Sequence, residues 1–398
     1  MISKKIVIGI SGGIAAYKTA ELVRLLVKEG FYVRVAMTKN AVNFVSPLTF
    51  EVLSGNKVIW DMFKHEKNME HILWAQDSDL IVIAPATANI IAKLAHGIAD
   101  DFISTMVLAT TAKVMICPSM NTQMFLNPIV QDNLKILKEI GFRIIDPEHG
   151  KLACGAVGAG RLPEPEEIFE EINDILTTKD LSGVKIIVTA GPTIEPLDPV
   201  RYITNRSSGK MGYSIAKMAK RRGAKVILIS GPSTLKPPKG IEIYQVKTAK
   251  EMRKKVLEKW QMCHVVIKAA AVADFRPEYS ASDKIKKEQG HVTLSLVKNP
   301  DILEELGKIK DNRILVGFAA ETKKLITNAK EKLYRKNLDL IVANDVSRKD
   351  AGFEVDTNIA KIISKDGKIE ETPLLKKDEL ANLILDKVKE LLHEKGII

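Results

Sequence analysis

The feature of this sequence that most limits its fold is a strand, glycine turn and helix pattern that occurs twice. The first copy runs from the apolar segment Lys4–Ile10 through Gly9–Gly13 into a helix. The second begins at Val184–Thr189, passes through Ala190–Thr193 and leads, after a long loop, into a helix over about Tyr213–Arg222. This pattern is typical of the start of a parallel, doubly wound sheet. The sequence therefore predicts an α/β fold with two doubly wound, Rossmann-like domains.

Short apolar runs predict the remaining strands of both sheets. They are Phe31–Met37, Leu80–Ala84, Ala112–Cys117 and Phe142–Asp146 in the first half, and Ala224–Ile229, His264–Ile267, Ile314–Phe318 and Leu340–Ala343 in the second. An amphipathic helix over Glu166–Leu176 and the polar stretch Thr177–Gly183 lie between the halves. We place the domain boundary there, which gives domains 1–180 and 181–398.

Composition excludes several classes of protein. No apolar run of the 398 residues is long enough to span a bilayer, and the N-terminus enters a strand directly, so we expect a cytoplasmic protein. Three cysteines without metal-ligand spacing argue against a disulfide framework and a structural zinc site. The net charge of +11 permits nucleic-acid binding, but its lysines and arginines are interspersed with acids and no basic aromatic motif occurs. Anionic small substrates explain the charge equally well.

Polar residues follow several strands of the first half. Because ligands of such sheets bind at the carboxyl ends of the strands, we expect Ser11, Thr38, Thr87, Asn89 and Asn121 to converge on one crevice. The turn at Ser11 offers N–H groups and a hydroxyl to a phosphate, although a tight turn needs glycine in any case. The GxGxxG pattern and an acid after the second strand are both absent, which argues against NAD.

Several of these residues have a purely structural alternative. Asn89 and Asn121 can each cap the helix that follows. His71 opens a predicted helix, where a lone histidine is more often a cap or a surface residue than a catalyst.

The stretch Lys151–Arg161, KLACGAVGAGR, is either a phosphate-binding loop or a mobile flap that carries the thiol of Cys154. No strand is predicted directly before it, and Ser11–Gly13 already offers a better phosphate site. The flap is therefore favoured, with the glycines as hinges.

A family resemblance emerges from the first-half motifs taken together. GISGGIAAYK, His71-Ile72, IAPATAN, GIADDFISTMVLA, PSMNTQM and LACGAVGAGR resemble the flavin-dependent cysteine decarboxylase family in order and spacing. Phe125 stands where that family usually has tryptophan. The resemblance implies a flavoprotein-type domain.

It also implies a role for individual residues. FMN would be held by Ser11, Gly12, Thr38, Thr87, Ala88 and Asn89. His71 would be the base of the oxidative step, Asn121 would bind the substrate carboxylate, and Cys154 would be the proton donor. This chemistry is consistent, since the flavin can take a hydride from the substrate, allow the carboxylate to leave, and return the electrons as the product is protonated.

The second half contains a candidate anion site at Ser207–Gly212 and a lysine-rich arm, Lys284–Lys287. The simplest interpretation of Arg276–Lys298 is a solvated loop with a short hairpin strand at His291–Val297. The arm also lies between the strand-end residues Asp274 and Asn299, an arrangement that suits a nucleoside triphosphate with Mg²⁺.

This half resembles the phosphopantothenate–cysteine ligase family over nearly its whole length, through TAGPT, RYITNRSSGKMG, AAAVADFRP, KIKK, VKNPDIL, GFAAET and RKNLDLIVAND. The resemblance implies that Asn205 contacts an acyl intermediate and that Lys284 contacts the triphosphate and aids acyl transfer. The nucleotide would be bound by Asp274, Lys284, Pro300, Asp301, Ile302, Leu303, Phe318, Lys332 and Lys336. CTP would activate the carboxylate as an acyl-cytidylate, with Mg²⁺ as the metal and metal ligands unknown.

Both resemblances fit one pathway, coenzyme A biosynthesis. The expected substrates are 4'-phosphopantothenate, L-cysteine, CTP and phosphopantothenoylcysteine, with no nucleic-acid or membrane partner. The resemblance further implies a homo-oligomer with trimeric decarboxylase and dimeric ligase contacts, together a dodecamer. Two other classes of protein are disfavoured: an inert flavin-binding regulator by the intact His71, Asn121 and Cys154, and a nucleic-acid-binding protein by the absence of a basic aromatic motif.

Overall fold

A computed structural model describes residues 3–63, 69–153, 155–286, 293–321, 324–345 and 355–398. The chain divides into two compact units, Met1–Thr177 (unit 1) and Thr178–Ile398 (unit 2). Within the described ranges, no helix has both the length and the apolar character that a membrane crossing needs.

Unit 1 is built on a five-stranded sheet with the strand order β2-β1-β3-β4-β5. Its strands are β1 (Lys5–Ile10), β2 (Tyr32–Met37), β3 (Leu80–Ala86), β4 (Lys113–Pro118) and β5 (Arg143–Ile144). Every neighbouring pair is parallel. The strand order reverses between β1 and β3, so the predicted doubly wound sheet is confirmed, with its ligand-binding switch point at the carboxyl ends of these two strands.

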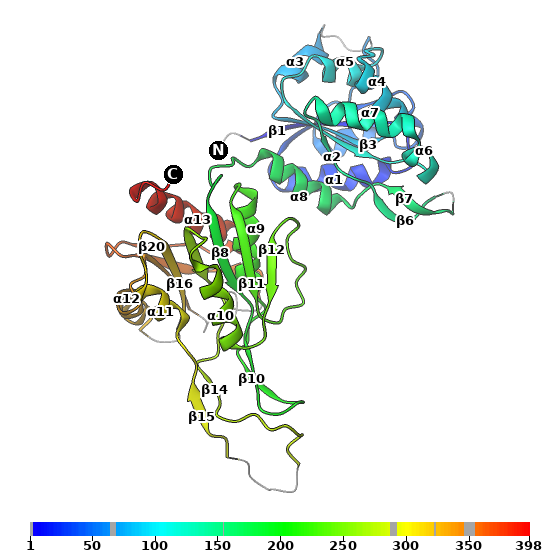
Figure 1. The fold of residues 1–398 in the computed structure, drawn as a ribbon. Helices are drawn as coiled ribbons and strands as arrows, with labels where there is room; N and C mark the ends of the chain where they lie inside the picture. Colours follow the sequence, from blue (N-terminus) through cyan, green and yellow to red (C-terminus); the bar gives the residue numbers. More distant parts are fainter. Residues whose placement is uncertain (1–2, 64–68, 154, 287–292, 322–323, 346–354) are drawn as a thin grey trace. The chain divides into compact units, whose positions relative to one another are not determined.

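Helices cover both faces of this sheet (Figure 1). The first face carries α1 (Ala16–Lys28), α2 (Pro47–Ser54) and α8 (Pro165–Leu176), and the second carries α3 (Glu70–Gln76), α4 (Ala88–His96), α5 (Phe102–Leu108) and α7 (Pro128–Glu139). Alternate residues of β1 pack into the cores on the two faces of the sheet: Ile6 and Ile8 on the first face and Val7 on the second. A strand buried on both faces needs the continuous apolar run that the sequence shows.

Unit 2 contains an eight-stranded sheet with the order β12-β11-β8-β13-β16-β17-β19-β20. The strands are β8 (Lys185–Ala190), β11 (Lys225–Ser230), β12 (Glu242–Gln245), β13 (Val265–Lys268), β16 (Ile314–Glu321), β17 (Leu340–Asp345), β19 (Ala360–Ser364) and β20 (Ile369–Glu371). The strands from β12 to β17 are parallel and the last two are antiparallel. The parallel part has the Rossmann order 3-2-1-4-5-6 by position in the chain, as predicted, with its switch point between β8 and β13.

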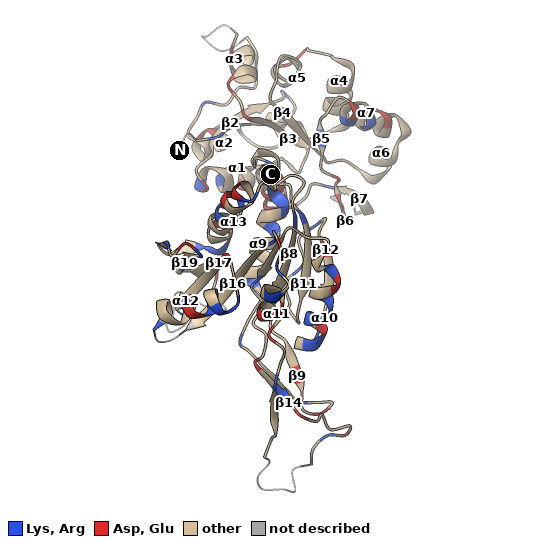
Figure 2. Ribbon diagram, turned by 60° about the vertical axis from the view of Figure 1, so that its left-hand side comes forward, with Lys and Arg blue, Asp and Glu red and all other residues tan. Residues whose placement is uncertain are grey.

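The helices of unit 2 again form two layers. The helices α9 (Lys210–Arg221) and α13 (Lys377–Glu394) lie on one face, and α10 (Ala249–Trp260), α11 (Ile302–Lys308) and α12 (Leu325–Arg335) lie on the other. Basic and acidic residues both occur along α10, α12 and α13 (Figure 2).

Two short hairpins extend from the carboxyl edge of the unit 2 sheet. They pair β9 (Ile194–Pro196) with β10 (Tyr202–Thr204) and β14 (Phe275–Pro277) with β15 (Leu296–Lys298). The predicted hairpin within Arg276–Lys298 is thus confirmed, although its strand begins at Leu296, and residues 291–292 of the predicted run lie outside the described ranges.

Candidate active sites

Ser11 joins the two strands of the switch point in unit 1. Its hydroxyl donates a hydrogen bond to the Pro85 carbonyl at 2.7 Å and accepts one from the Thr87 amide at 2.9 Å. The side chain is almost completely buried. Ser11 therefore holds the ends of β1 and β3 in register, and its hydroxyl is already used by the protein.

The glycines after Ser11 allow three strand-end loops to meet. A Cβ on Gly12 would stand 2.6 Å from the Cβ of Asn40, in the loop that follows β2. A Cβ on Gly13 would be 3.6 Å from the Cγ2 of Thr87, which follows β3. Any side chain larger than hydrogen at Gly12 would push the Asn40 loop away. Glycine is thus required at position 12 by this close approach.

A cavity of about 630 Å³ opens beside this turn. Its lining comes from the β1 turn, α1, the loops after β3 and β4, and a hairpin near the end of the unit: Gly12, Gly13, Ile14, Ala15, Tyr17, Lys18, Thr87, Ser119, Met120, Asn121, Met124, Lys151, Leu152, Ala153, Gly160, Arg161 and Leu162. Cavities of a few hundred Å³ accommodate a cofactor. Tyr17 and Met124 present broad exposed apolar surface, and the β1 turn presents backbone N–H groups, so the residues fit a flat ring system that carries a phosphate.

The hairpin that closes this cavity corrects one sequence expectation. A strand does directly precede the glycine-rich stretch, because β6 (Glu148–Lys151) pairs antiparallel with β7 (Val157–Arg161). This pair lies outside the parallel sheet, and its strands are too short and polar to show an apolar pattern. Cys154 lies outside the described residues.

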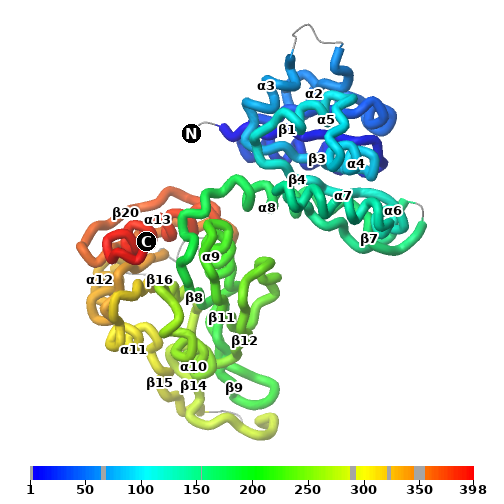
Figure 3. The backbone as a smooth tube through the Cα atoms, turned by 45° about the horizontal axis from the view of Figure 1, so that its top comes forward, coloured from blue at the N-terminus to red at the C-terminus, as the bar shows by residue number. Residues whose placement is uncertain are grey.

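The glycines of β7 are required for packing. A Cβ on Gly160 would be 2.1 Å from the Met120 carbonyl oxygen, and a Cβ on Gly158 would be 2.5 Å from the Thr122 Oγ1. The Met120 amide also donates to the Gly160 carbonyl at 3.0 Å. β7 thus lies directly against the loop after β4 and against α6 (Thr122–Leu126) (Figure 3). These two glycines hold the hairpin in contact with that loop, whereas a Cβ added at Gly155, which has a φ of +87°, would meet no atom within 4 Å.

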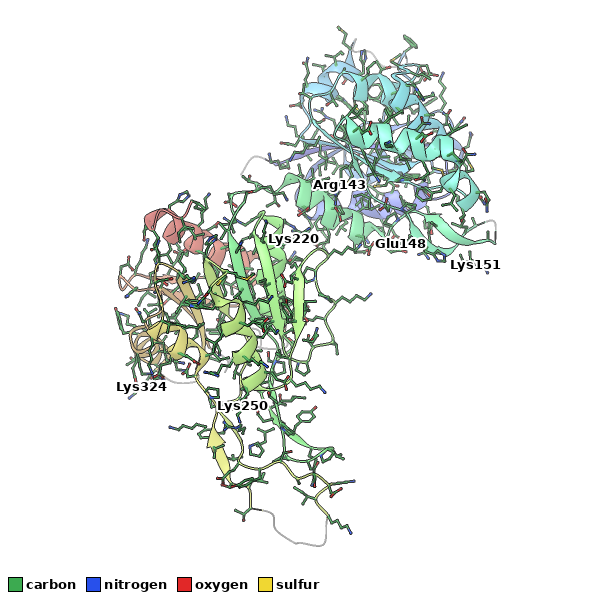
Figure 4. The ribbon with its side chains drawn as sticks, in the orientation of Figure 1. Arg143, Glu148, Lys151, Lys220, Lys250 and Lys324 are labelled. Atoms are coloured by element: carbon green, nitrogen blue, oxygen red, sulfur yellow. The ribbon has the colours of Figure 1, made fainter. Side chains whose placement is uncertain are left out.

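Charged residues fix the base of the hairpin. The buried Lys18 ammonium on α1 donates to the Leu162 carbonyl at 3.2 Å and to the Glu164 carboxylate at 2.9 Å. Arg161 forms ion pairs with Glu164 and Glu148. The hydrogen bond from Lys18 is the main cause that lowers the pKa of Glu164. Glu148 and Lys151, at the two ends of β6, mark the hairpin in Figure 4.

The structure places the predicted flavin residues unequally. Gly12 and Thr87 line the cavity, as does Asn121, whose predicted role is instead to bind the substrate carboxylate. Ala88 and Asn89 lie in the first turn of α4, where Asn89 is exposed. Asn121 is the N-cap of α6 and accepts from the Gln123 amide at 2.8 Å. The cap alternative therefore holds for Asn121 and not for Asn89, because Thr87 occupies the cap position of α4.

Thr38 and His71 are not part of the cavity lining. The Thr38 hydroxyl accepts from the Ala41 amide at 3.3 Å in the loop that contacts Gly12. His71 is the second residue of α3, whose Trp74 packs in the core on the face opposite α1. One copy of the chain thus does not bring His71 to the cavity.

In unit 2, the loops after β8 and β13 are joined by hydrogen bonds at the switch point. The Thr193 hydroxyl accepts from the Ala273 amide at 3.0 Å, and the Ala271 amide donates to the Gly191 carbonyl at 3.0 Å. The side-chain amide of Asn205 donates to the carbonyls of Ala271 and Val272 at 3.3 and 3.1 Å. Asn205 therefore lies directly over the loop after β13.

The lysine arm is anchored near the same edge. The Asp198 carboxylate accepts from the Ile285 amide at 3.2 Å and forms an ion pair with Arg201 at 2.6 Å, and Arg201 also donates to the Ile285 carbonyl at 2.8 Å. The hydrogen bond from Arg201 is the largest cause that lowers the pKa of Asp198. These contacts fix the backbone beside Lys284, while the Lys284 side chain is exposed.

The predicted nucleotide residues fall into two groups. Asp301 is the N-cap of α11 and forms an ion pair with Lys336 at 2.7 Å, and the Asp274 carbonyl accepts from the Asn299 amide at 2.8 Å. Burial acts to raise the pKa of Asp301, but the hydrogen bond and charge of Lys336 outweigh it and the pKa is lowered.

Three other predicted residues belong to the cores. Ile302 and Leu303 are buried on the α11 face, while Phe318 packs against the core of the α9 face. Because the side chains of Ile302 and Leu303 are used in the core, the predicted contact of these two residues with the nucleotide involves their main-chain atoms. Pro300 precedes α11, and Lys332 lies on α12.

Two charged residues at these sites are not predicted from the sequence. Lys18 is buried on α1 against the hairpin base, and Lys268 ends the otherwise apolar strand β13. In both cases the available signal is a lysine at a position where the pattern expects an apolar residue. Among the described residues, no group of three or more His, Cys, Asp or Glu is arranged to hold a metal ion.

Known families match both units. The family model described as Flavoprotein matches residues 1–177, and the one described as DNA/pantothenate metabolism flavoprotein C-terminal domain matches residues 181–392. The chain is 48% identical over 400 residues to the coenzyme A biosynthesis bifunctional protein CoaBC of Bacillus subtilis, covering 99% of this chain and 98% of that one. It is 46% identical over 403 residues to the protein of the same name from Escherichia coli K12, covering 100% and 99%.

Solved structures give partial matches. The crystal structure of the C-terminal domain of a CoaBC protein is 44% identical with a TM-score of 0.48, and the match covers 55% of this chain and 100% of that one. A PPC decarboxylase mutant complexed with pantothenoylaminoethenethiol is 28% identical with a TM-score of 0.39, covering 43% and 96%.

Proposed function

The chain belongs to the family of bifunctional coenzyme A biosynthesis proteins, which combine a flavoprotein decarboxylase domain with a ligase domain, and we propose how its two units divide and perform the two reactions. Unit 2 ligates 4'-phosphopantothenate to cysteine, and unit 1 decarboxylates the resulting phosphopantothenoylcysteine to 4'-phosphopantetheine. The observation that carries this division is that each unit has its own strand-order switch point with its own polar residues.

The cofactor of unit 1 is FMN. The backbone of the turn at Gly12 and Gly13 and Thr87 would hold its phosphate, and the cavity between α1 and the loop after β4 would accommodate its ring system. When bound, FMN supplies the two-electron chemistry that makes a carboxylate beta to a thiol able to leave. Ser11 supports this site by fixing the turn, because its hydroxyl is already hydrogen-bonded within the protein.

The chain's own groups bind the substrate and move its protons. Asn121 lines the cavity, where its amide oxygen accepts the helix-cap hydrogen bond and its NH₂ group binds the substrate carboxylate. Cys154, which lies between Lys151 and Val157 in the sequence, supplies the proton that completes the reduced product. The variant C154S is expected to keep the flavin and to release carbon dioxide without completing the reduction. Normal turnover of C154S would show that another group is the acid.

Unit 2 activates the carboxylate of 4'-phosphopantothenate with CTP. The carboxylate attacks the α-phosphate, pyrophosphate leaves, and the cysteine amine then displaces CMP. Lys284, Lys332 and Lys336 stabilise the charge on the phosphates, and Asn205 holds the acyl group over the loop after β13. Mg²⁺ enters with the nucleotide, since it typically binds through substrate phosphates and one or two carboxylates.

Product analysis tests the nucleotide. The full-length protein is incubated with 4'-phosphopantothenate, cysteine and either CTP or ATP, and the reaction is analysed for CMP or AMP. Formation of CMP with phosphopantothenoylcysteine is expected. AMP alone would overturn the assignment of CTP, and no nucleotide-dependent product would overturn the ligase assignment.

The decarboxylase sites lie between copies of unit 1 in a trimer, and dimeric contacts of unit 2 complete a dodecamer. The position of His71 supports the trimer, because its own copy does not bring it to the cavity and a neighbouring copy can. Mixing the variants H71N and C154S, neither of which is expected to form 4'-phosphopantetheine alone, tests this. Recovery of 4'-phosphopantetheine formation after subunit exchange is expected, and no recovery would contradict a shared site.

A further inference from the structure

Lys268 occupies the carboxyl end of β13, at the switch point of the unit 2 sheet. Along β13, Val266 packs in the core beneath α10, α11 and α12, and Lys268 follows it two residues later on the same face. Asp301, at the start of α11, and Lys336, at the end of α12, lie on this face as well. Strand geometry thus brings Lys268 to the cluster of charged residues that binds the nucleotide in the proposed function.

The charges around Lys268 do not balance. Its charged neighbours are Lys336, Asp301, Asp274 and Lys332. The Asp301 carboxylate is already paired with Lys336 at 2.7 Å and accepts from the Glu304 amide at 3.2 Å. Lys268 itself forms no hydrogen bond or ion pair with another residue in the described ranges. Lys268 is therefore a charged group that the neighbouring carboxylates leave without an ion pair of its own.

We propose that Lys268 is a further nucleotide-binding residue of the ligase unit, whose ammonium group pairs with the phosphate groups of the nucleoside triphosphate. The proposal rests on the ligase function of unit 2. A mostly buried cation without a partner is costly, and a polyanionic ligand removes that cost by supplying the missing charge. The side chain can meet the ligand without strain, since it extends from the end of a strand at which ligands of such sheets bind.

The protonation of Lys268 reflects this imbalance. Burial, followed by repulsion from Lys336, lowers the pKa of Lys268 to about 8. A fraction of the molecules is therefore neutral at this position near pH 8. Binding of a triphosphate favours the charged form, so the complex must take up protons from solution.

The first test compares K268M with K268R and with the control K185M. Lys185 is exposed at the opposite end of the neighbouring strand β8. With saturating 4'-phosphopantothenate and cysteine, K268M is expected to raise the KM for CTP about 10- to 100-fold, the usual range for a lost hydrogen bond to a charged group, with kcat within about twofold. K268R is expected to recover most of this loss and K185M to match the wild type. An unchanged KM in K268M, or a loss confined to kcat, would overturn the proposal.

The second test measures the proton uptake itself, independently of turnover. Calorimetric titration of the wild-type protein with CTP and Mg²⁺ at pH 8, in buffers of different ionisation heat, measures the protons taken up on binding. We expect net uptake that is absent in K268M and retained in K185M. Equal proton uptake in wild type and K268M would contradict the proposal.

The ligase function and the role of Lys268 fail in different ways. If the wild-type protein forms no product with any nucleotide and binds none, the ligase assignment fails and Lys268 loses its role with it. If the wild-type protein ligates normally and K268M binds CTP as tightly as the wild type, only the role of Lys268 fails.

Discussion

Replacing Gly160 by alanine tests the idea that the β6–β7 hairpin is held against the loop after β4 by close backbone packing. The new Cβ would stand 2.1 Å from the Met120 carbonyl oxygen, and the φ of Gly160 is +142°, a region that L-residues avoid. Backbone strain costs about 1–3 kcal/mol, and overpacking against main chain costs about 1–3 kcal/mol more. The free energy of unfolding of unit 1 should therefore fall by roughly 2–6 kcal/mol, which lowers its melting temperature by about 4–24 °C.

The matched control is G141A in the same unit. Gly141 has a φ of +97°, but a Cβ added there would meet no atom within 4 Å, so this change adds strain without a clash. Its cost should be about 1–2 kcal/mol. The difference between the two variants isolates the contact with Met120.

Activity gives a second measurement. In G160A the new methyl group pushes the hairpin away from the loop that carries Asn121. A displacement of about 1 Å near reacting groups lowers the rate about 100-fold. G160A should therefore lose decarboxylation of added phosphopantothenoylcysteine, while ligation by unit 2 continues. Melting is followed by flavin fluorescence, which reports on unit 1 alone. If G160A and G141A melt at the same temperature and decarboxylate equally fast, close packing at Gly160 is refuted.

Three further predictions concern unit 2. N205D places a carboxylate against the Ala271 and Val272 carbonyls and should slow ligation at least tenfold, while decarboxylation of added phosphopantothenoylcysteine stays unchanged; loss of both would indicate misfolding. D339A removes the ion-pair partner of the buried Lys310, which lies 2.7 Å away, and should lower the free energy of unfolding of unit 2 by about 3–5 kcal/mol. Thermal or urea unfolding measures this, and a decrease below about 1 kcal/mol would contradict the pairing. Because the pKa of Lys268 is lowered to about 8 in the folded protein, the unfolded chain binds more protons than the folded chain above that pH. The free energy of unfolding of the wild type should therefore rise by up to about 3 kcal/mol relative to that of K268M between about pH 8 and 10.5, and parallel curves of stability against pH would refute this.

The parallel sheets could be predicted because their strands are buried on both faces. Segments such as β3 and β13 must be continuously apolar, and each leads into a loop at the ligand-binding edge, so the sequence pattern indicates both the strand and its place at the site. A doubly wound sheet reverses its strand order at one point, as both sheets do. This strand order places Gly12, after β1, beside the loops that follow β2 and β3.

The hairpin at β6–β7 could not be predicted in the same way. Its strands lie outside the sheet and need no apolar alternation, and the glycines of β7 are explained by contacts with Met120 and Thr122, which are about forty residues away in the chain. The sequence shows that this segment is rich in glycine, but it does not distinguish glycines that make the chain flexible from glycines that allow close packing. Only the fold decides between them, and here it assigns Gly158 and Gly160 to close contact, while a side chain at Gly155 would meet no neighbour.

Lys18 and Lys268 show a third limit, which concerns charge. Each is a lysine at a position where the strand or helix pattern calls for an apolar residue, and its meaning depends on partners that are distant in sequence. Lys18 finds Glu164 at 2.9 Å, so the cost of its burial is offset within the protein and the pair fixes the hairpin. Lys268 finds no such partner among the described residues, so the compensating charge must come from outside. The same sequence signal thus marks a structural residue in one unit and a binding residue in the other, and the partner of the ammonium group distinguishes the two.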